Sequence, residues 1–377
     1  MRRSTRMALG AVCLWIGATL GAAGAAASSR IAGQIAGLQI AGLPAAPAAP
    51  AGGHSAGTLE RVREAGAVRC GITPSGAGLA AMDEAGHWRG FFADMCRALA
   101  AAVVGSTEGA SIVEIGTENR FSVLREGSVD VVMEGTTWTL QREASLAVAF
   151  PLVYMFDAQG FMAHRSVEPP TLAAIVRSSQ PASVCVVEGT TTVRNIEDWV
   201  ARTGARLTLK RARSTEGALG AFFNHHCDLY TGDRVGLYAQ RAQAAPNSDD
   251  YRILPEVISR EPLAPMVRND DHVWFNIVRW VILSTILAEE KGVTAATAAQ
   301  RRLDGDMETQ RLLGGVPGLG QGLGLDDEWG WRVVTQVGSY AEIYDRNLGQ
   351  SSPLKIDRGI NSLWSAGGLL YAPPLGW

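Results

Sequence analysis

Residues 129–142 read VDVVMEGTTWTLQR and contain the pattern that decides the fold class. Residues 129–133 are apolar enough to form a strand that is buried on both faces. Small polar residues follow directly, and Arg142 is expected two or three residues into a helix. A buried strand that ends in a polar turn before a helix is typical of parallel sheets covered by helices.

The same alternation of strand and helix continues on both sides of this stretch. Further strands are expected at residues 67–72, 111–115, 159–163, 183–187, 207–210, 227–230 and 253–254. Helices are expected at residues 92–104, 120–126, 171–177, 192–202, 215–224 and 234–242. Residues 273–287 are apolar but include Asn276 and Arg279, which favours a packed helix over a membrane span. Two such sets of elements predict an α/β protein with two lobes.

The N-terminus has the features of an export signal. Arg2, Arg3 and Arg6 precede an apolar segment, and small residues suited to cleavage follow it. We therefore predict a cleaved signal peptide at residues 1–27. Residues 28–57 are rich in Ala, Gly and Pro and cannot build a core, so they are expected to be a linker.

Composition excludes several classes of protein. The chain has 377 residues, 47% of them apolar and 19% charged, which argues against a disordered chain or a coiled coil. Its net charge of −3 gives no electrostatic reason to expect a nucleic-acid partner. We find no motif for a nucleotide cofactor, and therefore expect no cofactor.

Four cysteines remain after the signal peptide: Cys70, Cys96, Cys185 and Cys227. An even number in an exported protein favours two disulfides, for which three pairings are possible. Pairing of neighbours, 70 with 96 and 185 with 227, is the most economical. Buried free thiols are the alternative, and a zinc site is disfavoured because His225, His226 and Cys227 have no matching second cluster.

Three polar turns follow predicted strands and are the candidate recognition sites. Arg142 offers a guanidinium that can bind a carboxylate with two hydrogen bonds. Residues 190–192 are three threonines at a helix start, where free N–H groups favour an anion. Asp233 can cap the next helix or bind an ammonium group. Because ligands bind beyond the carboxyl ends of strands in open α/β sheets, the three turns together indicate a zwitterion such as an amino acid.

Several longer stretches give the chain a family resemblance. They are TTWTLQR (136–142), EGTTT (188–192), CDLYTGD (227–233), ILPEVISREPLAPMVRNDD (253–271), FNIVRW (275–280) and SPLKIDRGINSLW with GGLLYAPP (352–374). The chain resembles the solute-binding proteins of polar amino-acid ABC importers, and most of all the larger general L-amino-acid binding proteins. The resemblance covers residues 58–376.

The resemblance implies a type II periplasmic binding fold, with two α/β lobes joined by two crossing segments and the ligand between them. Lobe 1 would comprise residues 58–157 and 262–377, and lobe 2 residues 158–261. It also implies a monomeric periplasmic protein that passes a small amino acid to the permease subunits of an importer, without metal or catalytic residues. Relatives of this subfamily carry the same cysteine pairs.

The resemblance also implies roles for individual residues. Arg142 would bind the α-carboxylate of the ligand, with Thr137 beside it and Gly135 as a backbone contact. Thr190 and Thr191 would contact the same carboxylate from lobe 2. Asp233 would receive the α-ammonium, and Phe91 would form an aromatic wall of the pocket.

The chain departs from these relatives at the edge of the expected cleft. Glu134 stands where they carry a basic residue, and the loop of residues 73–79 is small and rich in glycine. If Glu134 faces the ligand, neutral or cationic ligands are favoured over acidic ones; otherwise it points to solvent or pairs with an arginine. Because a buried glutamate could act as a general acid, Glu134 also leaves an alternative function possible, that of a secreted enzyme resembling prephenate or arogenate dehydratases. A sensory or accessory binding protein is the other alternative.

Overall fold

The structure is a computed structural model that describes residues 57–376. The predicted signal peptide and all but the last residue of the predicted linker lie outside these residues. Within the described residues, no helix has the length and apolar character needed to cross a membrane. The segment 273–287, predicted to be a packed helix, lies within a helix whose buried side belongs to the core.

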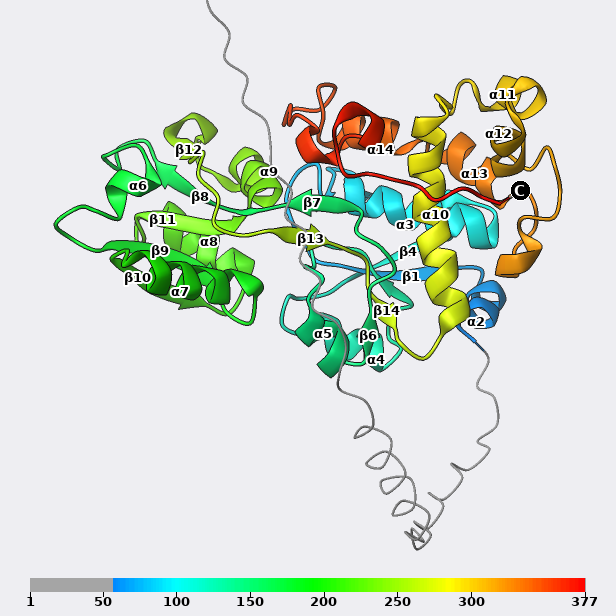
Figure 1. Cartoon of the computed structure of the whole chain (residues 1–377). Coiled ribbons are helices and arrows are strands. Elements are labelled where there is room, and N and C mark those ends of the chain that lie inside the picture. The colour runs from blue at the N-terminus through cyan, green and yellow to red at the C-terminus, as the bar shows by residue number, and fades with distance from the viewer. Residues whose placement is uncertain (1–56, 377) are drawn as a thin grey trace, which may run out of the picture. The chain divides into compact units, whose positions relative to one another are not determined.

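The first sheet is parallel and three-stranded, in the order β4-β1-β5. One face packs against the largest apolar cluster, which includes α3, α10, α13 and α14 (Figure 1). The elements around this sheet are α2 (Thr58–Ala65), β1 (Val68–Ile72), β2 (Ala81–Met82), β3 (Trp88–Arg89), α3 (Phe91–Val104), η1 (Thr107–Gly109), β4 (Ala110–Glu114), α4 (Arg120–Arg125), β5 (Val131–Val132), α5 (Leu140–Ser145) and β6 (Val148–Ala149). We call this part lobe 1.

The second sheet is five-stranded and mixed, in the order β10-β9-β11-β8-β12. Its strands alternate their side chains between two apolar clusters. Cys185 and Val187 face one cluster with α8, whereas Val184 faces the other with α6 and α7. Its elements are β8 (Gln159–His164), α6 (Leu172–Ile175), β9 (Ala182–Val187), α7 (Thr191–Thr203), β10 (Leu207–Ala212), α8 (Thr215–Phe223), β11 (Leu229–Asp233), α9 (Arg234–Ala244), η2 (Ser248–Asp250) and β12 (Tyr251–Ile253). We call this part lobe 2.

Two short antiparallel pairs accompany the passage of the chain between the sheets. β7 (Met155–Asp157) leads into β8, and β13 (Glu261–Leu263) returns beside it (Figure 1). β14 (Val267–Arg268) then pairs with β6. The two sheets are thus joined by two segments that run antiparallel to each other. The exact lobe boundaries at residues 157, 158, 261 and 262 stay a prediction.

The C-terminal part returns to lobe 1 and covers its sheet. The helix α10 (His272–Glu290) is capped by the preceding residue, Asp271, whose Oδ1 accepts from the Trp274 N–H at 2.9 Å. The Trp274 indole donates to the Asp130 carbonyl at 2.8 Å, which fixes α10 beside β5. The remaining helices are α11 (Ala298–Asp304), α12 (Met307–Leu312), η3 (Gln321–Leu323), α13 (Trp329–Gln336), α14 (Tyr340–Asn347), η4 (Gly359–Asn361) and η5 (Trp364–Ala366).

The cysteines form the two local pairs that the sequence favoured. Cys70 in β1 is bonded to Cys96 in α3, and Cys185 in β9 is bonded to Cys227 just before β11. The first disulfide lies within lobe 1 and the second within lobe 2. Neither ties the lobes together, so relative motion of the lobes is not blocked by a covalent link.

Removing the lobe 2 disulfide should destabilise the protein without changing its fold. The double variant Cys185→Ser/Cys227→Ser opens a loop whose ends are 42 residues apart in sequence, and it should lose about 2–5 kcal/mol of unfolding free energy. Urea unfolding of the variant and of the wild type measures this loss. Peptide mapping without reduction checks the pairing itself. A peptide joining Cys70 or Cys96 to Cys185 or Cys227 would refute both the pairing and the freedom of the lobes to move.

Candidate functional site

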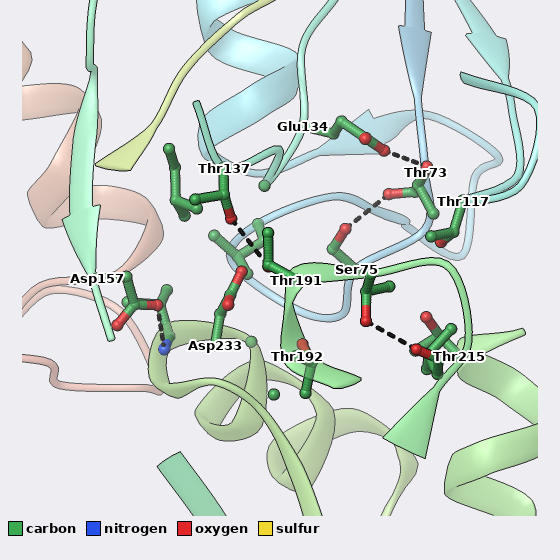
Figure 2. A pocket seen from close by; sticks show the side chains of 18 of the residues that line it. Thr73, Ser75, Thr117, Glu134, Thr137, Asp157, Thr191, Thr192, Thr215 and Asp233 are labelled. Atoms are coloured by element: carbon green, nitrogen blue, oxygen red, sulfur yellow. Dashed lines mark hydrogen bonds between the residues drawn. The ribbon is translucent and has the colours of Figure 1, made fainter. Parts of the chain in front are cut away.

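A cavity of about 130 Å³ is lined by residues of both lobes. Lobe 1 contributes the loop after β1 and the turn after β5, and lobe 2 contributes the turns after β9 and β11. Of the predicted ligand-binding residues, the structure brings seven to this cavity: Glu134, Gly135, Thr137, Arg142, Thr190, Thr191 and Asp233. Figure 2 shows several of them with the hydrogen bonds they form.

Arg142 is a buried cation that forms no ion pair with a carboxylate among the described residues. It lies in α5, which begins after Thr139, whose hydroxyl accepts from the Arg142 N–H at 3.2 Å. The guanidinium donates to the Thr137 carbonyl at 2.7 Å and lies over the ring of Phe121. Burial lowers the pKa of Arg142 to about 10, and the neighbouring Arg120 also lowers it. Within residues 57–376 no carboxylate forms an ion pair with it, so it is charged, buried and available to an anion.

Asp233 enters the cavity from lobe 2 at the end of β11. It precedes α9, but its side chain makes no capping hydrogen bond. Asp157 supplies that bond instead, because its Oδ2 accepts from the Val235 N–H at 2.9 Å. Asp233 Oδ2 lies 3.6 Å from the position that a Cβ atom would take at Gly135 of lobe 1, so the carboxylate approaches the turn after β5. Of the two roles that the sequence left open for Asp233, the geometry thus excludes helix capping and leaves a cation partner.

The two aspartates at this end of the cavity repel each other. Burial raises the pKa of the Asp233 carboxyl well above its usual range, and the charges of Asp157 and Glu261 add to the shift. Burial also raises the pKa of Asp157 to about 6, against lowering by its two backbone N–H donors and by Arg234. A bound cation would relieve this repulsion, since an opposite charge favours the ionised carboxylate.

Glu134 is buried and paired with an arginine. Its Oε1 accepts from the Arg120 guanidinium at 2.9 Å, and its two oxygens also accept from the hydroxyls of Thr136 and Thr73. Of the alternatives that the sequence left open, Glu134 thus follows pairing with an arginine, and its carboxylate does not act as a lone negative charge. It nevertheless lines the cavity together with Arg120.

The role predicted for Phe91 is wrong. It was expected to form an aromatic wall, but its ring is fully buried in the core of lobe 1, edge-on to Tyr154 and Tyr340. The next residue, Phe92, lines the cavity instead. Both belong to the first turn of α3, and the phase at which this helix starts decides which of them turns inward.

Thr190 and Thr191 stand at the start of α7. The Thr190 hydroxyl donates to the Val187 carbonyl at 2.7 Å and makes no bond to the helix start. The first N–H groups of α7 are therefore not capped by the side chain of Thr190. The Thr191 hydroxyl lies 3.4 Å from the Thr137 hydroxyl of lobe 1, within hydrogen-bond distance. This turn is placed to receive a negative group.

Sequence reasoning missed Glu261, which does not itself line the cavity but contacts two residues that do, Thr137 and Thr191. It is 2% exposed on the crossing strand β13, without an ion-pair partner among the described residues. It accepts from Thr137 of lobe 1 at 2.5 Å and from two lobe 2 residues, Asn195 at 2.5 Å and Thr191 at 3.3 Å. Ser259, two residues before Glu261 in the chain, donates at 2.5 Å. One carboxylate thus holds groups from both walls of the cavity.

The glycine-rich loop of residues 73–79 allows the lobes to approach closely. Gly76 has a φ of +99°, and a Cβ atom there would lie 2.9 Å from the Ala239 carbonyl carbon in α9. A larger residue would push α9 away and widen the cavity. The small size of this loop, noted in the sequence, therefore has a packing reason.

The chain is similar to known binding proteins over most of its length. The family described as bacterial extracellular solute-binding proteins, family 3, matches residues 68–290, more than half of the chain. The chain is 38% identical over 323 residues to the general L-amino acid-binding periplasmic protein AapJ of Rhizobium johnstonii, covering 85% of this chain and 93% of that protein. It is also 38% identical over 325 residues to the glutamate/glutamine/aspartate/asparagine-binding protein BztA of Rhodobacter capsulatus, covering 86% of this chain and 95% of that protein.

A solved structure is similar over nearly the same range. It is the ABC transporter periplasmic binding protein from Brucella ovis with glutathione bound, which aligns with a TM-score of 0.82 and 36% identity. The alignment covers 85% of this chain and 100% of that chain. The fold and the sequence therefore point to the same group of proteins.

Proposed function

We propose, since the chain belongs to family 3 of the bacterial extracellular solute-binding proteins, that it binds one free amino acid between its lobes and delivers it to an ABC importer in the periplasm. The observation that carries this proposal is a pair of unpaired charges at one cavity. Arg142 of lobe 1 is a cation without a carboxylate partner among the described residues, and Asp233 of lobe 2 is a carboxylate without a cation partner there.

A zwitterion complements these two charges. The α-carboxylate would lie at Arg142, with the Thr137 hydroxyl and the start of α7 beside it. The α-ammonium would lie at Asp233, where the nearby Asp157 adds negative charge. Burying either charge of the ligand costs several kcal/mol unless it meets an opposite charge. A molecule with only one of the two charges would leave the other anchor unpaired.

Closure of the lobes is the proposed mechanism. The two anchors come from different lobes, so a ligand that contacts both has higher affinity for the closed form and shifts the population toward it. The two crossing strands β7 and β13 would act as the hinge, between lobe 1 at residues 58–157 and 262–377 and lobe 2 at residues 158–261. Hinge closure of this kind is common in periplasmic binding proteins. A permease would then recognise the closed form.

The size of the cavity favours a single amino acid. Its volume of about 130 Å³ is below the ~300–1,000 Å³ of pockets for drug-sized ligands. A tripeptide such as glutathione, the ligand named for the Brucella ovis structure, would need more room. We therefore expect this chain to prefer free amino acids over glutathione.

Calorimetry of the purified protein with the twenty amino acids and glutathione tests the proposal. At least one amino acid should bind in the micromolar range or more tightly, and glutathione should bind more weakly. Binding of none of the twenty would contradict the proposed function. The same protein should not turn over prephenate or arogenate; turnover that is lost in Glu134→Gln would establish an enzyme instead.

Binding and stability should respond to pH in opposite directions because of Asp157. Its folded pKa of about 6 lies above the ordinary value of 3.8, so between these values the folded state binds the proton more tightly than the unfolded state does. The melting temperature of the ligand-free protein should therefore rise as the pH falls from 7 to 5. Amino-acid affinity should fall over the same range, since protonation removes negative charge beside the α-ammonium.

The variant Asp157→Asn is the control for this pH dependence. It retains a side chain of the same shape but cannot ionise, so the part of each trend that comes from Asp157 should disappear. Melting curves and calorimetric titrations at pH 5, 6 and 7 measure them. An unchanged pH dependence in the variant would assign the titration to another group, with Asp233 as the neighbour that faces Asp157.

A further inference from the structure

The cavity has two chemically different ends. Asp157, Asp233 and Thr137 lie at one end, whereas Ser75, Thr117 and Thr215 lie toward the other (Figure 2). The first end contains the proposed anchors for the α-ammonium and α-carboxylate. The second end is therefore where the side chain of the ligand would lie, and its chemistry decides which amino acid is accepted.

The charged groups outside the anchors already neutralise each other. Arg120 and Glu134 both line the cavity, are 6% and 2% exposed, and form an ion pair at 2.9 Å. Thr73 and Thr136 also donate to Glu134. This pair offers no net charge to a ligand side chain. A charged ligand side chain would be buried against one partner of like charge and one that is already paired, which is unfavourable.

Two buried polar atoms of cavity-lining residues have no partner among the described residues. One is the Arg120 Nε–H, a donor, and the other is the Gln240 Oε1, an acceptor. Buried polar atoms are normally hydrogen-bonded, so each of these two lacks a partner in the ligand-free protein. The missing partners are one acceptor and one donor; a carboxamide supplies both kinds of group, whereas a carboxylate only accepts and an ammonium only donates.

We propose that the Arg120–Glu134 pair selects amino acids with a neutral, hydrogen-bonding side chain, a carboxamide above all, over acidic and basic ones. The carboxamide oxygen would accept from Arg120, and its amide N–H groups would donate to Glu134 or Gln240. This inference rests on the proposed function and specifies the class of amino acid. It assigns to Arg120 and Glu134 the part of specificity-determining residues.

Reciprocal substitutions test the pair. In Glu134→Gln the Arg120 charge is left unpaired, so glutamate should gain affinity relative to glutamine by roughly tenfold to a thousandfold. In Arg120→Gln the Glu134 charge is left unpaired, so arginine and lysine should gain relative to glutamine by a similar factor. Calorimetry with glutamine, glutamate, arginine and lysine measures both changes, and the wild type should bind glutamine most tightly of the four.

Asp130→Asn is a matched control. Asp130 is also a buried carboxylate near β5 that pairs with an arginine, Arg69 at 2.6 Å, but it does not line the cavity. It should leave the ranking of the four ligands unchanged. A change of ranking in this control, equal to that in Glu134→Gln, would mean that loss of any buried ion pair alters the site.

The outcomes separate this inference from the proposed function. If the wild type binds none of the twenty amino acids, the proposed function fails. If it binds amino acids but prefers glutamate, arginine or lysine to glutamine, or if both variants retain the wild-type ranking, only the inference is overturned. Should a variant fail to fold, shown by its melting curve, the wild-type ranking still decides.

Discussion

Amino-acid affinity should fall by about 30-fold to several thousand-fold in Arg142→Met. Truncating one partner of a buried charge pair costs about 2–5 kcal/mol or more, and each 1.4 kcal/mol is a factor of ten. Arg142 is the one predicted anchor that brings a positive charge to the cavity, and methionine retains much of its apolar stem against Phe121. Calorimetry with the preferred amino acid of the wild type measures the loss.

Two further variants make this result specific. Arg125→Met removes an exposed arginine of α4 and should leave the affinity unchanged. Arg142→Lys retains the charge but loses the planar fork that binds a carboxylate twice, so its loss should be intermediate. If Arg142→Met binds the amino acid as tightly as Arg125→Met does, the carboxylate lies elsewhere and the assignment of the anchor is wrong.

Replacing Asp233 with asparagine should weaken binding by a comparable factor while stabilising the ligand-free protein. The side chain keeps its shape but cannot neutralise the α-ammonium. In the ligand-free protein, however, the Asp233 carboxylate is repelled by Asp157 and Glu261 and disfavoured by burial, which raises its pKa well above the usual range. Removing the charge removes this cost. Opposite signs for affinity and stability are the mark of a residue selected for binding.

Calorimetry and melting curves of the same sample test both halves of the prediction. Asp198→Asn, which removes an exposed carboxylate from α7, should change neither quantity. A loss of stability in Asp233→Asn would show that the carboxylate has a structural role in the ligand-free protein. Unchanged affinity would place the α-ammonium at another group, Asp157 being the neighbour.

The regular parts of the fold follow from local sequence patterns. The expected strand at residues 183–187 corresponds to β9 and the expected helix at residues 234–242 to α9, because both have clear apolar periodicity. The expected strand at residues 129–133 shortens to β5, although Asp130 and Met133 still donate to backbone carbonyls of β1. Local patterns do not predict the pairs β7 with β13 and β6 with β14, since each joins two or three residues that are about a hundred positions apart. The family resemblance implied only that two segments cross between the lobes.

The site residues likewise divide into those that local sequence patterns predict and those that only the tertiary fold brings together. Arg142, Thr191 and Asp233 stand on turns directly after strands or at helix starts, which local patterns identify. Arg120 and Glu261 carry no such signal. Arg120 acquires its role from a carboxylate 14 residues away, and Glu261 from donors 66 to 124 residues away. Only the tertiary fold brings these groups together, so one sequence could not reveal them.

The contacts of Glu261 have a consequence for the hydroxyl groups at the cavity. A threonine hydroxyl has one proton to donate, and Thr137 and Thr191 both direct it to the Glu261 carboxylate. An incoming α-carboxylate that needs these protons must compete with Glu261 for them. Each proton then has two rival acceptors, one inside the chain and one in the ligand. The measured affinity would then be the difference between two sets of hydrogen bonds, those that the hydroxyls donate to the ligand and those that they first donate to Glu261.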